Sequence, residues 1–183
     1  DASPWSVATA HLTYLEDREV AWHRHKLATA GNRKTILLSH HQLFSATSAV
    51  GVDSAGQKLA VNTRLYEAFQ DVLGGVNTWL WGHEHNLTMY DSYLGLARGR
   101  CIGAGAVPIR VSENPYTPDP TLVLPPGQSS PPPLNTAVQL GDDGESYNHA
   151  YAVLTLRGPA AEIAYYQLPA EGASELLFAE QIG

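Results

Sequence analysis

The hydrophobic and polar positions between residues 35 and 81 predict a strand, a helix and a second strand. Residues 35–39 form a short apolar run between turn residues, which is typical of a strand covered on both faces. Residues 64–73 carry an apolar stripe at helical spacing, and Asn62 and Thr63 can cap that helix. Residues 76–81 form the second buried strand. This order predicts two parallel strands joined by a right-handed crossover.

A further helix is predicted upstream, at residues 16–30. Its apolar face is set by residues that recur at helical spacing, namely Val20, His23, Leu27 and Ala30. Acidic residues crowd the first turn, as the helix dipole favours, and a glycine follows the last turn. We expect His23 and His25 on this helix to be ordinary surface or core-edge residues.

Four other segments have weaker patterns. Residues 42–61 contain glycine and serine with little periodicity, so we expect a loop that lies over a site. Short strand-like runs follow at residues 87–93 and 100–111, and glycines interrupt them. Residues 113–135 are proline-rich, which predicts an extended surface loop of polyproline character.

The last third of the chain carries one further signal. Residues 150–156 and 161–168 alternate in polarity, which predicts a hairpin around Arg157, Gly158 and Pro159. The tail from residue 169 to residue 183 shows no clear pattern. We therefore expect one partial domain over residues 1–183, with an α/β part at 1–112, the proline-rich loop at 113–135 and a closing hairpin with its tail at 136–183.

Composition narrows the class of protein. The chain of 183 residues has 11 Lys and Arg against 18 Asp and Glu, for a net charge of −7. That balance argues against a broad nucleic-acid footprint, because backbone binding needs a basic stripe. No apolar run is long enough to span a membrane and no signal peptide is visible, so we expect a soluble, cytoplasmic protein. The single cysteine, Cys101, is expected to be a small buried hydrophobe.

Histidines follow both predicted parallel strands. His40 and His41 come directly after the first strand, and His83 and His85 follow the second. The carboxyl ends of parallel strands meet at one edge of a sheet, where open α/β folds bind their ligands. If the backbone after residue 82 stays extended, His83 and His85 point to the same side. We therefore expect the two clusters to meet in space.

Clustered imidazoles indicate a metal site. Neutral imidazole is a common ligand of divalent transition metals, and burying several together is costly unless each is bonded or ligated. His40, His83 and His85 are the candidate ligands. A lone histidine is more often structural, and we expect this of His11 and His149.

These motifs resemble the last two metal-binding motifs of the calcineurin-like metallophosphoesterases, which include purple acid phosphatases and many bacterial phosphodiesterases. The resemblance lies in SHHQLF at residues 39–44, a helix, and WGHEHN at residues 81–86, within roughly residues 16–108. It implies an α/β fold, part of a four-layer αββα β-sandwich flanked by helices. It also implies hydrolysis of phosphate esters, by a phosphatase or phosphodiesterase.

The resemblance assigns a role to each histidine. His40 and His83 would ligate one ion and His85 a second, in a two-metal site of manganese, iron or zinc. His41 does not match a ligand position, so it would sit behind the ligands or face the substrate. Glu84 would point away from the site and serve the structure. The two ions would stabilise the attacking hydroxide and the charge that develops on phosphate.

The family's earlier motifs are not in this chain. They are Asp-x-His, Gly-Asp-x-x-Asp and Gly-Asn-His-Asp or -Glu, and the chain's Asp53, Asp91, Asp142 and Asp143 lie in the wrong contexts to replace them. The chain therefore resembles the C-terminal half of such an enzyme, and we expect it to be inactive alone, with an unpaired strand edge that makes it sticky or dimeric. Its partners would be the missing N-terminal half and a phosphate ester, whose identity the sequence leaves open.

Two other functions are considered. In the first, the histidines hold a single structural or transport metal in a non-catalytic module, and the proline-rich loop meets a protein partner. A metallo-β-lactamase-type hydrolase would need an HxHxDH pattern, whereas His85 is followed by Asn86 and Leu87. This second function, a metallo-β-lactamase-type hydrolase, is therefore set aside.

Overall fold

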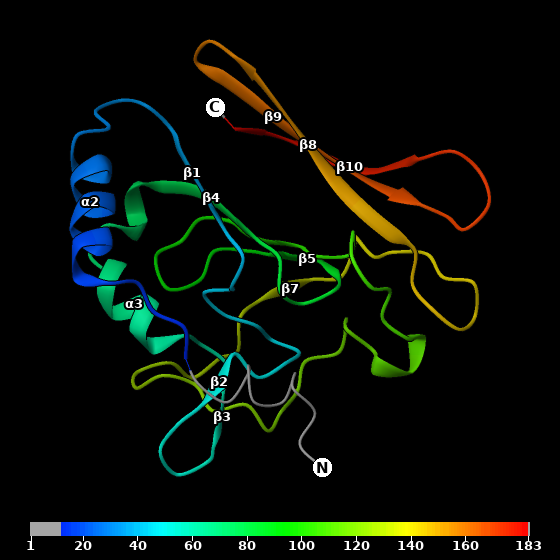
Figure 1. Cartoon of the computed structure of the whole chain (residues 1–183), viewed down its shortest axis with the longest axis horizontal. Coiled ribbons are helices and arrows are strands. Elements are labelled where there is room, and N and C mark those ends of the chain that lie inside the picture. The colour runs from blue at the N-terminus through cyan, green and yellow to red at the C-terminus, as the bar shows by residue number, and fades with distance from the viewer. Residues whose placement is uncertain (1–11, 183) are drawn as a thin grey trace.

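The computed structural model describes residues 12–182, which form a mixed α/β structure with two sheets that share a core (Figure 1). The larger sheet has five strands, and a three-stranded sheet packs on one of its faces. Two α-helices of the described part lie toward the opposite face, beside β1 and β4 in Figure 1. The α/β class predicted from the sequence is confirmed.

The five-stranded sheet has the order β1-β4-β6-β5-β7. Its strands in that order are β1 (Thr35–Ser39), β4 (Val76–Trp81), β6 (Gly99–Ile102), β5 (Leu87–Tyr90) and β7 (Leu134–Asn135). β1 and β4 are parallel, with Ser39 paired to Trp81 at their carboxyl ends. The predicted parallel pair is therefore confirmed. β6 is also parallel to β4, whereas β5 is antiparallel to both β6 and β7.

Helix α3 (Thr63–Phe69) connects β1 to β4 and is shorter than predicted. Its N-cap is Asn62, whose side chain accepts a hydrogen bond from the Leu65 backbone N–H, as the sequence predicted. The 3-10 turn η1 (Leu73–Gly75) follows before β4 begins. Leu65 and Phe69 are buried against the sheet, which confirms the predicted apolar stripe.

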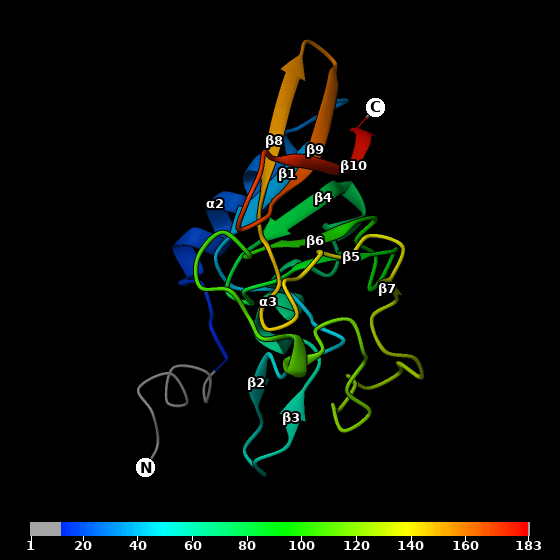
Figure 2. The ribbon, with the colours of Figure 1, turned by 90° about the vertical axis from the view of Figure 1, so that its right-hand side faces the viewer.

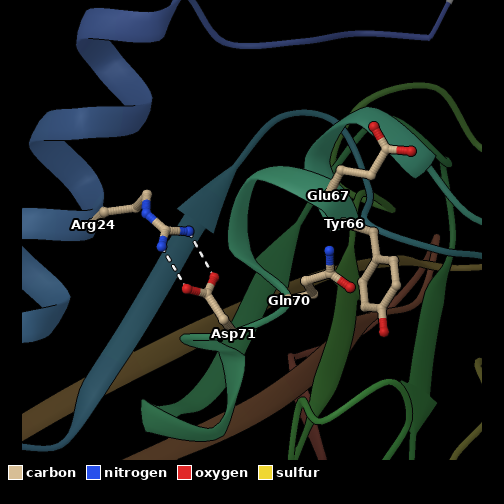
Figure 3. Close-up of a pocket in the computed structure, with 5 residues that line it drawn as sticks. All are labelled: Arg24, Tyr66, Glu67, Gln70 and Asp71. Carbon is tan, nitrogen blue, oxygen red and sulfur yellow. Dashed lines mark hydrogen bonds and ion pairs between the residues drawn. The ribbon is translucent and has the colours of Figure 1, made fainter.

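Helix α2 (Asp17–Ala28) lies within the predicted range but packs loosely. None of its residues is fully buried, and Leu27 makes a partly buried contact with the core. A guanidinium–carboxylate pair joins α2 to the end of α3: Arg24 donates to both carboxylate oxygens of Asp71 at 2.6 and 2.5 Å (Figure 3). Arg24 also donates to the Ala68 carbonyl at 2.8 Å. These bonds connect α2 to the end of α3 at the surface.

The second sheet contains the predicted hairpin and one unpredicted strand. The hairpin strands β8 (His149–Arg157) and β9 (Ala160–Leu168) are antiparallel, as predicted. The third strand, β10 (Glu175–Ile182), pairs with β9 and comes from the tail that showed no pattern. Figure 2 shows this sheet rising beyond the end of the larger one.

Alternate residues of β4 serve the two cores. Trp79 and Trp81 join the core on the helix side, whereas Leu80 joins the core shared with the second sheet. Because side chains alternate along a strand, this division matches the pleat. The prediction of a buried strand at residues 76–81 is therefore confirmed.

An ion-pair network fastens β10 to the larger sheet. Arg100 of β6 donates to both carboxylate oxygens of Glu180 on β10, each at 2.8 Å. Arg98 lies 3.2 Å from the same carboxylate, and the Tyr165 hydroxyl donates to it at 2.7 Å. Burial acts to raise the pKa of Glu180, but the Arg100 hydrogen bonds and charge outweigh burial, and the pKa is lowered.

The expectation that β1 is covered on both faces is wrong. Leu38 is 71% exposed, and β1 is an edge strand, paired only with β4 among residues 12–182. The expected open strand edge is thus present. Ile36, on the same face of β1, packs against the core shared with the second sheet, whereas Leu38 does not.

The expected loops carry short regular pieces. Residues 42–61 contain the small hairpin of β2 (Gly51–Val52) and β3 (Lys58–Leu59), and the 3-10 turn η2 (Val111–Glu113) precedes the proline-rich loop. That loop is otherwise irregular until β7, as predicted. Within residues 12–182, every helix is too short or too polar to cross a lipid bilayer.

Candidate metal centre

The carboxyl ends of β1 and β4 bring the two histidine segments together. β1 ends at Ser39 and β4 at Trp81, and these residues are paired in the sheet. One step further on, the Gly82 backbone N–H donates to the His40 carbonyl at 3.0 Å. The parallel pairing therefore continues to the point where the imidazoles begin, as the sequence predicted.

Three imidazoles meet at this edge. His40, His41 and His83 each offer a ring nitrogen within 4.8 Å of the other two. His40 Nε2 and His83 Nδ1 are 3.3 Å apart, and the ring centroids of His41 and His83 are 4.4 Å apart. Such a group can hold one metal ion, because imidazole nitrogens are common ligands of divalent transition metals.

His85 lies outside this group of three. The condition for His83 and His85 to share a side was an extended backbone, and His83 instead has a positive φ of 54°. β4 ends at Trp81, and residues 82–86 form bends rather than strand. The turn at His83 directs its ring toward His40 and His41, so His41 takes a place in the group that the sequence assigned to His85.

The electrostatics of the group keep its central ring neutral. Burial, followed by the neighbouring His41, His40 and His85, lowers the pKa of His83 to about 4. Burial and then His40 also lower the pKa of His41. A neutral imidazole keeps a nitrogen lone pair free, which is the form that binds a metal ion. The donors present therefore fit a divalent transition metal.

Cys101 shapes the loop that carries His83. The backbone carbonyls of Gly82, Glu84 and Asn86 lie 3.5, 3.3 and 3.5 Å from the Cys101 sulfur. The loop therefore curls around a buried thiol, whose pKa burial raises well above its ordinary value. Cys101 is buried, as predicted, but it also has this polar role, which the sequence did not indicate.

Gly103 makes room for the same loop. A Cβ atom at Gly103 would lie 1.9 Å from the Glu84 carbonyl oxygen, which is closer than atoms can approach. Glycine is therefore required at this position for the loop to keep its path. From the sequence alone, Gly103 can be recognised only as a break in a strand-like run.

The backbone of His41 is fixed from the sheet. The Ser39 hydroxyl donates to the His41 carbonyl at 2.7 Å, and the Trp79 indole N–H donates to the Ser39 oxygen at 2.8 Å. These two hydrogen bonds link Trp79 of β4, through Ser39 of β1, to the backbone of His41. Ser39 and Trp79 are thus supporting residues that the sequence pattern did not single out.

The other histidines take ordinary roles where the structure describes them. The His149 ring lies 3.1 Å from the Ala104 carbonyl, a structural hydrogen bond of the kind predicted. His23 packs edge-on against Phe69 at the border of the core, whereas His25 is exposed on α2. His11 lies outside the described residues.

Among the described residues, no carboxylate joins the three imidazoles. Within residues 12–182, the only group of three or more potential metal ligands found close together is His40, His41 and His83. Asp53 and Asp143 accept backbone N–H bonds within their own turns, as does Asp142.

Comparison with protein-family models found no match for this chain, and a search of curated proteins found no significant match.

Proposed function

We propose that the chain binds a divalent transition metal ion through His40, His41 and His83, as part of a metal-dependent phosphoric ester hydrolase. One observation carries the proposal: three imidazole nitrogens from the ends of two parallel strands lie within 4.8 Å of one another. Three protein ligands leave a coordination position free for water or substrate, as in catalytic zinc sites. In phosphoryl transfer such ions, when bound, polarise the phosphate and activate water.

The complete enzyme, in this proposal, holds two ions of zinc, iron or manganese. His40 and His83 serve the first ion, and His85, on the same loop, serves the second. His41 lies beside the first ion and, in this chain alone, completes its ligand set. The remaining ligands, including a bridging carboxylate, would come from the N-terminal half of the same domain.

The open edge of the larger sheet supports a missing half. β1 presents an unpaired strand edge in the described part, and Leu38 on it is 71% exposed. On the core-facing side of the β8–β9 hairpin, Leu156 is 68% exposed. Further strands beside β1 would cover both residues. They would also extend the two packed sheets into the β-sandwich of the calcineurin-like fold, to which we assign the chain on its motifs.

Metal binding and turnover are measured separately. Zinc or manganese titrated into the metal-free chain should bind, whereas the chain with manganese should not hydrolyse a generic phosphodiester or phosphomonoester. The reason is that three imidazoles cannot bridge two cations. Clear turnover by this chain, abolished in His83→Ala, would contradict the need for a second half.

A single-metal, non-catalytic module is the second candidate. It is favoured by the absence of any carboxylate from the imidazole group within residues 12–182. Elemental analysis of the native protein with its copurifying half separates the two functions. Two metal ions per site support the hydrolase, and a single ion supports the module.

A further inference from the structure

Glu84 lies between two histidines but faces the interior. Its carboxyl group is buried, and Oε1 accepts a hydrogen bond from the Ser48 hydroxyl. The second oxygen, Oε2, is buried without a hydrogen-bond partner among the described residues. Burial raises the pKa of Glu84, and hydrogen bonding to the hydroxyls of Ser45 and Ser48 acts against this rise. A buried carboxyl group is costly, so its retention at this position needs an explanation.

The partner of Glu84 belongs to the other histidine segment. Ser48 follows His40 and His41 by a short stretch of buried residues, 42–46. It closes a tight turn in which the Ser45 oxygen accepts the N–H groups of Thr47 and Ser48, both at 3.1 Å. The Glu84–Ser48 bond therefore joins the segment after β1 to the loop after β4.

The turn that holds Ser48 is itself anchored in the core. The Ser45 N–H donates to the Ala60 carbonyl at 2.9 Å, and the Ala46 N–H donates to the Tyr90 hydroxyl at 3.3 Å. Tyr90 is fully buried in β5. Glu84 thus reaches a rigid point of the structure rather than a free loop.

The loop of Glu84 is held from a second direction by Cys101. The sulfur lies 3.3 Å from the Glu84 carbonyl oxygen, so backbone and side chain of this residue are both fixed. His83, directly before it, has a left-handed backbone with a φ of 54°. Non-glycine residues keep that conformation only where surrounding contacts impose it. Glu84 makes two such contacts, one through its carbonyl oxygen with Cys101 and one through its carboxyl group with Ser48.

We propose that Glu84 is a positioning residue, which through its hydrogen bond to Ser48 fixes the His83 ring against His40 and His41. This inference rests on the proposed metal site. Residues that hydrogen-bond to metal ligands hold those ligands in the right orientation, and losing such a residue typically lowers metal affinity 10- to 100-fold. Glu84 would orient His83 through the backbone of their shared loop, from the side opposite the ion.

The test compares Zn²⁺ affinity by calorimetry in the full chain and in matched variants. Glu84→Ala and Ser48→Ala should each bind Zn²⁺ about tenfold more weakly. The double variant should lose no more than Glu84→Ala alone, because Glu84→Ala already removes the bond to Ser48. Glu84→Gln keeps an oxygen for Ser48 and should retain wild-type affinity. Glu145→Ala, in an exposed loop, is the control.

A second readout does not depend on metal. In NMR spectra of the metal-free chain, the ring-proton resonances of His83 and His40 should shift in Glu84→Ala and Ser48→Ala but not in Glu84→Gln. Unchanged resonances and affinity in Glu84→Ala would overturn the inference. Equal losses in Glu84→Gln and Glu84→Ala would also overturn it, since the carboxylate and not the bond would then matter. A wild-type chain that binds no Zn²⁺ contradicts the proposed metal site, while the resonances still decide the role of Glu84.

Discussion

His40 Nε2 and His83 Nδ1 lie 3.3 Å apart although 43 positions separate the residues in the chain. The parallel pairing of β1 and β4 accounts for this approach, because both residues come one or two positions past the paired strand ends. The Gly82–His40 backbone hydrogen bond extends that pairing. The sheet therefore brings the imidazoles together without needing an ion to hold the segments.

Gly103→Ala should disrupt the loop that carries His83. The new methyl group would meet the Glu84 carbonyl at 1.9 Å, so the loop must move. We expect a loss of about 1–3 kcal/mol in the free energy of unfolding, as for overpacked sites, together with weaker Zn²⁺ binding. Urea denaturation and calorimetry measure the two effects.

Gly74→Ala is the matched control for that change, because a Cβ atom at Gly74 would meet no non-neighbouring atom of residues 12–182 within 4 Å. It should leave both stability and Zn²⁺ binding near those of the wild type. A Gly103→Ala protein that binds Zn²⁺ as tightly as the Gly74→Ala protein would show that the loop path does not determine the site.

Glu180→Gln should destabilise the chain in a pH-dependent manner. The substitution leaves Arg100, whose side chain is 8% exposed, without its charged partner, so we expect a loss of about 3 kcal/mol at neutral pH. The pKa of Glu180 is lowered from 4.5, so its contribution is present above that value and is lost as pH falls through the folded pKa.

The stability difference between wild type and Glu180→Gln should therefore shrink in acid. Urea denaturation at neutral pH and near pH 3 measures it, with the exposed Glu145→Gln as control. A difference that stays constant across this range would mean that the Glu180 charge does not stabilise the docking of β10.

Leu38→Lys should reduce self-association. Leu38 is 71% exposed on edge strand β1, and a lysine on an edge strand opposes pairing with another chain. Size-exclusion chromatography should show the wild type in dimers or larger species that bind a hydrophobic dye, and less of both in the variant. Val107→Lys, 63% exposed on a loop, is the control. A monomeric wild-type chain that does not bind the dye would refute self-association through the edge of β1.

The local pattern was sufficient to predict the strand, helix and strand that carry the site. Apolar runs, the Asn62 cap and the hairpin turn are set by neighbouring residues, and the structure contains each of them. β10 was missed because its register with β9 shifts between Leu176 and Phe178, which breaks the alternation that marks a strand.

The identity of the third imidazole depends on distant residues. Whether His41 or His85 joins His40 and His83 is decided by the turn at His83, which Cys101 and Gly103 shape from another strand and its following loop. The prediction that His83 and His85 share a side requires an extended backbone at His83. Contacts from β6 and its following loop accompany a left-handed backbone at His83 instead, and no pattern within residues 81–86 indicates that turn.

The metal centre is tested by measuring how many Zn²⁺ ions bind the wild-type chain and four single alanine variants. Calorimetry and elemental analysis should find one ion per wild-type chain. Binding should be lost in His83→Ala and His40→Ala, weakened in His41→Ala and kept in His85→Ala. Binding lost in His85→Ala but kept in His83→Ala, or no binding to the wild type at all, would contradict a metal centre at the joined ends of β1 and β4.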